Sequence, residues 1–253
     1  MFPDTAEFYL FAIPAVVLVG LAKGGFTGLG ALGTPLMALG MRDPVRAAAI
    51  LLPILIAQDV VGVTAFRRTW SGRILAIMLP GAVVGIGLGY LLAATISEAA
   101  VMAVLGVISI LFGAYRLWAD HGGRISAASN SPAWVGTLFG VATGFTSQIA
   151  HAGGPPFQMW VMPRKLDRDT FVGTSAIFFA AVNWLKVPAY AALGQFTLEN
   201  AAATVVLLPI AVASSLAGVK LVRKVPMERF YTIVYWLLII AGAKLLLDGL
   251  KIT

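Results

Sequence analysis

Long apolar runs separated by short polar gaps dominate the sequence. Ten such runs carry few charges. They lie at residues 8–22, 26–40, 45–66, 74–95, 99–118, 133–150, 155–163, 171–192, 201–222 and 230–247. Most are long enough to cross a hydrocarbon core of about 30 Å as an α-helix that rises about 1.5 Å per residue. The pattern therefore predicts an all-α, polytopic helical membrane protein.

Two of the runs are too short to cross in this way. Thr27–Leu39 reaches only about 20 Å as a helix, and Pro155–Met162 reaches less. Each run follows or includes a glycine-rich stretch. Irregular backbone is tolerated at membrane depth only where protein or a water-filled cavity surrounds it. The two runs are therefore either re-entrant segments or parts of interrupted spanning helices.

The distribution of Lys and Arg favours ten segments over eight. If both short runs re-enter, ten basic residues lie on one side of the membrane and seven on the other. If both cross, thirteen lie on one side and four on the other, namely Arg42, Arg46, Lys244 and Lys251. Because short cytoplasmic loops carry an excess of Lys and Arg, ten segments fit better, with eight as the alternative. Both termini are then predicted to lie outside the cytoplasm.

The two halves of the chain resemble each other. Gly25-Phe26-Thr27 recurs as Gly144-Phe145-Thr146, and with a shift of 124 residues Asp59 falls on Asn183. Five segments per half would place the halves in opposite orientations, and inverted repeats with an interrupted segment in each are typical of secondary transporters. We predict a first transmembrane repeat at residues 1–118, a polar cytoplasmic linker at 119–132 and a second repeat at 133–253.

The composition narrows the class of protein further. Apolar residues make up 59% of the chain and charged residues 11%, with a mean hydropathy of +0.90. A soluble domain is about 45–50% apolar and about 25% charged, and a small globule has too much surface to hide this excess. The net charge is +7, but the basic residues lie mostly in the gaps between apolar runs. This is the positive-inside pattern, so we predict no nucleic-acid binding.

The reactive residue types are few. Cysteine is absent, which excludes disulfides, thiolate metal sites and cysteine nucleophiles. The two histidines, His121 and His151, are too far apart for an HExxH zinc motif, and no metal or cofactor is predicted. The start of the chain, residues 1–7, is acidic rather than basic, so the first apolar run is predicted to be a retained transmembrane helix and not a signal peptide.

The first glycine-rich stretch, Gly20–Pro35, is a candidate anion site. Its six glycines in sixteen residues disfavour a continuous helix by roughly 1 kcal/mol each relative to alanine. Amide hydrogens freed at a helix start carry partial positive charge and bind anions. We expect Thr27, Gly28 and Gly30 to contact the substrate, and Thr27 or Thr34 to cap the following helix. Close helix packing through small residues is the alternative interpretation.

The second glycine-rich stretch, Gly144–Pro156, adds polar side chains at the predicted membrane depth. Such groups must find a partner or water there. We expect it to contribute five ligands: Ser147, Gln148, His151, Gly153 and Gly154. The histidine can donate a hydrogen bond or carry a proton. A structural histidine satisfied by its neighbours is the alternative for His151.

A third set of polar residues lies inside long apolar runs. Lys186 is fifteen residues into its run, and Asn183 shares its helix face. An intramembrane lysine costs several kcal/mol unless it is paired or hydrated, so Lys186 is a candidate ligand for the anion, with a snorkelling anchor as the alternative. Gln58 and Asp59 lie in the middle of a run in the first half. Asp59 is a candidate coupling residue or an ion-pair partner of Lys186.

These motifs resemble a known family. Lys23–Pro35, Gly144–Pro156, Gly173-Thr174-Ser175 and the Asn183–Gly194 segment are similar to the sulfite exporter TauE/SafE family of membrane permeases, over essentially the whole chain. The resemblance implies transport of small sulfur-containing anions such as sulfite or sulfoacetate, or of related organic anions, in a bacterial inner membrane. Members are described with seven or eight spans, fewer than the ten segments predicted here. Lys23 receives no role, since many relatives are uncharged there.

The sequence thus predicts a secondary transporter that exports a small anion by alternating access. The anion would bind near the midplane, between the two glycine-rich stretches. An anion channel of the same fold is the first alternative. An intramembrane enzyme based on His151 and Asp59 is the weaker one, because a second nearby histidine, a cysteine and a serine nucleophile motif are absent from the sequence. The predicted partners are the anion and the lipid bilayer, with a homodimer left open, and both termini are predicted to be periplasmic.

Overall fold

The computed structural model describes the chain apart from residues 1–5, 24–28, 121, 123–129, 222–227 and 252–253. The described residues form ten α-helices and two 3-10 turns, with no strand among them. The helices are α1 (Ala6–Lys23), α2 (Gly33–Met41), α3 (Pro44–Phe66), α4 (Gly72–Thr95), α5 (Glu98–Asp120), α6 (Ala133–Ala150), α7 (Gly154–Val161), α8 (Arg168–Ala192), α9 (Leu198–Leu221) and α10 (Glu228–Lys251). The turns are η1 (Leu29–Leu32) and η2 (Met162–Arg164).

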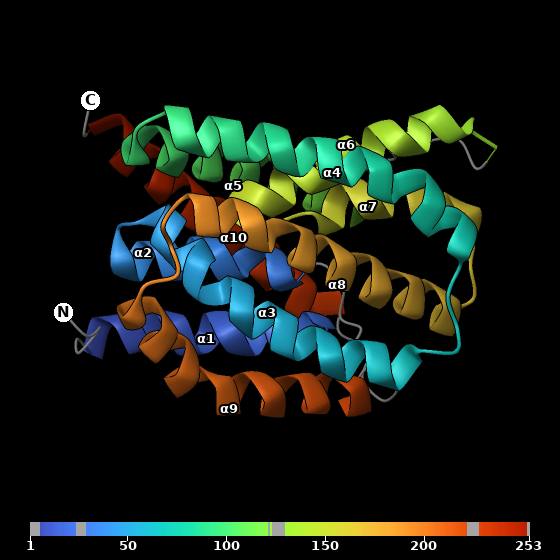
Figure 1. Cartoon of the computed structure of the whole chain (residues 1–253), viewed down its shortest axis with the longest axis horizontal. Coiled ribbons are helices and arrows are strands. Elements are labelled where there is room, and N and C mark those ends of the chain that lie inside the picture. The colour runs from blue at the N-terminus through green and yellow to red at the C-terminus, as the bar shows by residue number, and fades with distance from the viewer. Residues whose placement is uncertain (1–5, 24–28, 121, 123–129, 222–227, 252–253) are drawn as a thin grey trace.

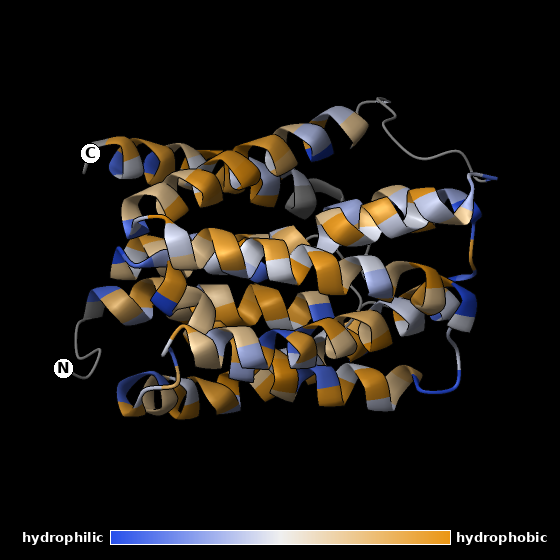
Figure 2. Cartoon of the chain, turned by 45° about the horizontal axis from the view of Figure 1, so that its top comes forward, coloured by the Kyte–Doolittle hydropathy of each residue, from blue (hydrophilic) through white to orange (hydrophobic). Residues whose placement is uncertain are grey.

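Six helices are long and apolar enough to cross a membrane: α3, α4, α5, α8, α9 and α10. Their apolar segments hold 19 to 25 residues, which corresponds to roughly 28–38 Å of helix. They lie side by side in one bundle, with hydrophilic residues concentrated toward the helix ends (Figures 1 and 2). Large apolar side chains such as Leu111, Val205 and Ile240 face outward, as lipid contact requires. The predicted polytopic helical membrane fold is confirmed.

The short helix α2 turns back along α1. A Cβ atom on Gly33 would meet Val19, and one on Gly40 would meet Phe11, so residue numbers rise along α2 as they fall along α1. The two helices are therefore an antiparallel hairpin whose glycines allow close contact. The chain leaves α2 near the level at which α1 began.

The pair α6 and α7 repeats this arrangement. Gly153 lies against Thr143, and Trp160 lies against Gly136, which again makes the two helices antiparallel. At nine and eight residues, α2 and α7 rise about 14 and 12 Å, well short of a hydrocarbon core of about 30 Å. The ten predicted segments correspond to ten described helices, of which α2 and α7 are too short to cross the membrane on their own. A hairpin that enters the membrane and returns leaves the loops before and after it on one side, as two full crossings would. The distribution of Lys and Arg in these loops is therefore the same for a hairpin and for two crossings.

The helices are interrupted where glycine and proline predict it. Helix α6 ends at Ala150, and His151 takes a left-handed conformation with φ of 50°. The amide of His151 donates to the Ser147 carbonyl at 3.1 Å and that of Ala152 to the Thr146 carbonyl at 3.2 Å, which closes the helix end. The interruption predicted within Gly144–Pro156 is confirmed.

The first glycine-rich stretch is described up to Lys23, where α1 ends, and again from Leu29, where η1 begins. The predicted ligands Thr27 and Gly28 fall outside the described residues. The residue that precedes α2 is Leu32, without a side-chain cap, so the expected cap by Thr34 is wrong. The Thr34 hydroxyl is buried and makes no hydrogen bond among the described residues.

Glycines bring α4 and α6 into close contact. A Cβ atom on Gly144 would lie 2.1 Å from the Ala82 carbonyl oxygen, and one on Gly85 would lie 2.0 Å from the Val141 carbonyl oxygen. Gly144 therefore serves helix packing and lies inside α6 rather than at a break. The same principle joins α5 to α10, where Gly106 and Gly242 face each other.

This packing gives a stability prediction with a matched control. Gly85→Ala places a methyl group against backbone of α6, and such overpacking costs about 1–3 kcal/mol. Gly87→Ala, two residues along the same helix, meets nothing within 4 Å. We expect Gly85→Ala to lower the thermal unfolding midpoint in detergent and Gly87→Ala to leave it unchanged or raise it. Equal midpoints for the two variants would contradict the close contact.

Candidate functional site

A cavity lined in part by polar side chains lies where the end of α1, the turn η1 and the connection between α6 and α7 meet α3 and α8. Its volume is about 100 Å³, which is room for several water molecules. The described lining comes from α1, η1, α3, α6, α7, α8 and the connection between α6 and α7. Its polar side chains are Lys23, Ser147, His151, Gln158, Ser175 and Asn183. The two interruptions and the long helices between them thus contribute to one site.

One polar cluster joins α1, α3 and α8. The Lys23 ammonium forms an ion pair with Asp59 Oδ1, and Asn183 Nδ2 donates to Asp59 Oδ2 at 2.6 Å. Both carboxylate oxygens of the buried Asp59 are thereby occupied. The pair Asp59 and Asn183 consists of the two residues that the shift of 124 makes equivalent. The expected direct pair of Asp59 with Lys186 is not formed, and Lys23 takes that place.

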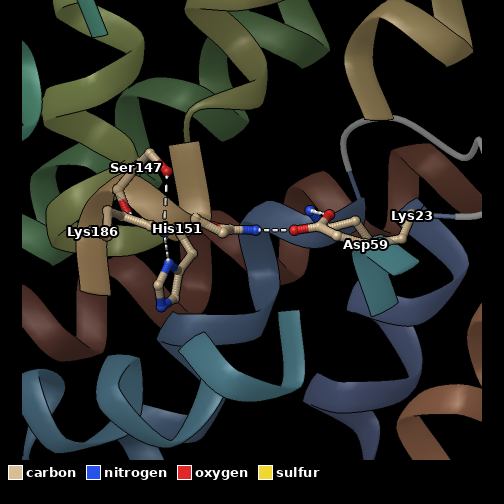
Figure 3. A network of polar contacts seen from close by, with 6 residues as sticks. Lys23, Asp59, Ser147, His151 and Lys186 are labelled. Atoms are coloured by element: carbon tan, nitrogen blue, oxygen red, sulfur yellow. Dashed lines mark hydrogen bonds and ion pairs between the residues drawn. The ribbon is translucent and has the colours of Figure 1, made fainter. Parts of the chain in front are cut away.

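A second polar cluster joins α6 and α8, next to the first (Figure 3). Lys186 is fully buried. Its Nζ lies 2.6 Å from His151 Nδ1 and 3.3 Å from both the carbonyl and the hydroxyl oxygen of Ser147. His151 Nε2 lies 2.8 Å from the Ala48 carbonyl oxygen. Because a carbonyl oxygen only accepts, Nε2 carries the hydrogen and Nδ1 accepts from Lys186, which assigns a neutral imidazole.

The two clusters together carry excess positive charge. With both lysines protonated, the described residues supply two ammonium groups, Lys23 and Lys186, and one carboxylate, Asp59. Asp59 is engaged by Lys23 and Asn183, so the three acceptors of Lys186 are all uncharged. A buried ion without a bonded counter-ion is costly. The arrangement is therefore suited to an anion that supplies the missing charge.

The start of α7 adds few backbone donors. Pro155 and Pro156 have no amide hydrogen, and the amides of His151 and Ala152 are bonded to α6. Gly153 and Gly154 remain as the backbone donors of this turn. At this turn the expected cradle of several amides is thus reduced to two, and we expect the side chains around the cavity to carry more of the binding. Within the described ranges, no group of three His, Asp or Glu side chains could hold a metal ion.

Five of the predicted ligands line the cavity: Gly30, Ser147, His151, Gly154 and Asn183. Lys186 lies behind this surface, in contact with Ser147 and His151. Gly153 packs against Thr143 and Phe179. Sequence reasoning missed Lys23, Gln158 and Ser175, although a lysine at the start of a glycine-rich stretch and a glutamine inside a short apolar run were visible signals.

Two predicted residues lie away from the cavity. The Gln148 side chain is close to Gly89 of α4, and it lines a separate small cavity with Tyr190. Gln58 Nε2 donates to the carbonyl oxygens of Val16 at 3.4 Å and Ala211 at 3.3 Å. The structure therefore places Gln58 as a bridge between α3, α1 and α9, and does not bring Gln148 to the other ligands.

These features are those of a multi-pass helical membrane protein with a cavity between helix hairpins that several polar side chains line. The family model of the sulfite exporter TauE/SafE matches residues 12–245, nearly the whole chain. The chain therefore belongs to the sulfite exporter TauE/SafE family, and the resemblance seen in its motifs is confirmed. The family is one of membrane transporters for sulfite-type anions, which points away from an enzyme. No match was found among curated proteins or among solved structures.

Proposed function

We propose that the protein is a secondary transporter that exports a small sulfur-containing oxyanion, such as sulfite or sulfoacetate, by alternating access. One observation carries the proposal: the buried Lys186 ammonium has three uncharged acceptors and no bonded carboxylate among the described residues. An oxyanion in the adjacent cavity would supply the counter-charge. Its other contacts would be the Gly154 amide and the side chains of Lys23 and Asn183.

Asp59 is the proposed coupling residue. While its carboxylate is ionised, it holds Lys23 in an ion pair and withdraws that charge from the cavity. A proton on Asp59 would neutralise the carboxylate and leave Lys23 to the anion. Anion and proton would then bind together, and the proton gradient or the membrane potential, worth about 2.3 kcal/mol per charge per 100 mV, could drive net transport.

Two inverted repeats, residues 1–118 and 133–253 joined by a cytoplasmic linker, are the proposed basis of alternating access. Support comes from the contacts between helices in equivalent places of the two halves. Helix α1 of the first half packs on α9 of the second, and the equivalent helix α6 of the second half packs on α4 of the first. The equivalent helices α3 and α8 pair with each other, as do α5 and α10. The contact of Asp59 with Asn183 also fits, because equivalent residues meet at a two-fold axis. Rocking of one hairpin against the long helices would expose the cavity to each side in turn.

The proposed location is the bacterial inner membrane, with both termini periplasmic. Helix α1 begins and α10 ends at the same end of the bundle (Figure 1). The Lys and Arg residues after α3 and between α7 and α8 belong to the opposite end. Since cytoplasmic loops are rich in Lys and Arg, we infer that this opposite end is cytoplasmic.

Flux of radiolabelled sulfite and sulfoacetate in proteoliposomes tests the function. We expect saturable uptake that is accelerated when unlabelled anion is present on the other side, because a carrier returns faster when loaded. Flux far above carrier rates without this acceleration would identify an anion channel instead. Empty liposomes and liposomes that hold an unrelated membrane protein serve as controls, and flux equal to theirs would contradict the proposal.

A further inference from the structure

Gln158 connects the cavity to an arginine on a distant helix. Its side chain is 5% exposed and lines the cavity from α7. Arg116 of α5 donates from Nη1 to Gln158 Oε1 at 3.1 Å and from Nε to the Tyr235 hydroxyl at 3.0 Å. Arg116 also lies over the Tyr235 ring, 5.1 Å from its centre. The arginine is therefore held by contacts with both α7 and α10.

This contact determines which way the Gln158 amide points. An arginine only donates hydrogen bonds, so the atom that faces Arg116 must be the amide oxygen. The amide nitrogen then lies on the other side, 3.7 Å from where a Cβ atom on Gly154 would be. It is thus beside Gly154, in the first turn of α7. No hydrogen bond from this nitrogen is found within the described part of the chain.

We propose that Gln158 is a substrate-recognition residue whose amide nitrogen donates to the bound oxyanion, and that Arg116 is a positioning residue that holds the amide in this orientation. The inference deepens the proposed function and rests on it. It also describes the ligand more closely: two N–H donors at the start of α7 favour a charged acceptor oxygen. An ionised sulfite or sulfonate group meets this requirement.

Binding of radiolabelled sulfite to the purified full-length protein in detergent tests the role of Gln158. Gln158→Met keeps the volume and removes the donor, and we expect the Kd to rise about tenfold, as for a lost hydrogen bond to a charged group. Gln158→Glu keeps an acceptor for Arg116 and places a carboxylate beside the anion. We expect the Kd of this variant to rise about a hundredfold, because the introduced carboxylate repels the anion. The protein is expected to stay folded, since the carboxylate would pair with Arg116.

A double-mutant cycle tests the role of Arg116. Arg116→Met frees the Gln158 amide to rotate, and we expect the Kd to rise about three- to tenfold, since part of a charged hydrogen bond is lost. In the Gln158→Met background the same change is expected to leave the Kd unaltered, because Arg116 acts only through Gln158. Arg46→Met is the matched control. That arginine also bridges helices, to Asn200 at 2.9 Å and Glu199 at 3.0 Å, and is outside the cavity lining.

Three results would overturn the inference. An unchanged Kd in both Gln158 variants would remove Gln158 from the site. Additive effects of Arg116→Met and Gln158→Met would mean that Arg116 acts on general stability, as would an equal loss of binding in Arg46→Met. Failure of the proposed function is distinguishable, because it would show as the absence of sulfite binding in the unmodified protein.

Discussion

Lys186→Met is expected to reduce sulfite flux in proteoliposomes by roughly a hundredfold or more. The anion would lose its buried cationic partner, and loss of one member of a buried charge pair costs about 2–5 kcal/mol. Methionine fills a similar volume and has no charge to desolvate. We therefore expect the variant to be purified as a folded protein, with its chief defect in anion binding. The measurement is initial flux together with the Kd for sulfite in detergent.

Lys244→Met is the matched control for this experiment. Lys244 is an exposed lysine on α10 and pairs with Asp248 one helical turn away at 2.9 Å. Such a surface pair contributes little to stability, so flux is expected to stay at the level of the unmodified protein. If Lys186→Met also retained full flux, with intact binding, Lys186 would be a structural residue and the anion site would lie elsewhere.

Asp59→Asn is expected to separate anion binding from proton coupling. Asparagine keeps the shape and can still contact Asn183, but it has no charge with which to hold Lys23. The cavity gains one net positive charge, so we expect a sulfonate probe to bind more tightly. Transport driven by a pH gradient is expected to fall to the level of exchange without a gradient, since the variant has no carboxylate to carry the proton.

The pH dependence of binding gives this prediction a definite sign. In the unmodified protein, the proposed coupling proton on Asp59 would release Lys23, so affinity for the anion is expected to rise as pH falls. In Asp59→Asn the affinity is expected to be high and to lose this dependence. A sulfonate is the right probe because it stays ionised across the range. Asp248→Asn, at an exposed ion pair on α10, is the control, and persistent pH dependence in Asp59→Asn would assign coupling to another group.

Local features of the sequence were enough to predict the class of fold and the helix breaks. The long apolar runs correspond to α3, α4, α5, α8, α9 and α10. A membrane-spanning helix satisfies its own backbone hydrogen bonds, so it needs only a sufficiently long run of apolar residues. Glycine and proline end helices through their own backbone preferences, so the interruption between Ala150 and Gly154 was visible in the chain. The family resemblance rests on motifs that include the same stretch.

The composition of the site could be predicted only in part. Lys186 and Asn183 were candidates because polar groups inside apolar runs are costly, and the structure brings them to neighbouring clusters. Which groups meet them was hidden, since the contact of Lys23 with Asp59 joins residues 36 positions apart and that of Asn183 with Asp59 joins residues 124 apart. Such contacts depend on how whole hairpins dock.

Gln148 and Gln158 illustrate what only the tertiary structure decides. Both are buried glutamines in the helices that flank the second break, yet Gln148 faces α4 and Gln158 faces the cavity. In water an amphipathic stripe would indicate the inward face of each helix. In a bilayer both the lipid and the protein interior accept apolar side chains, so the pattern specifies that a helix is embedded but leaves its rotation to packing against its neighbours.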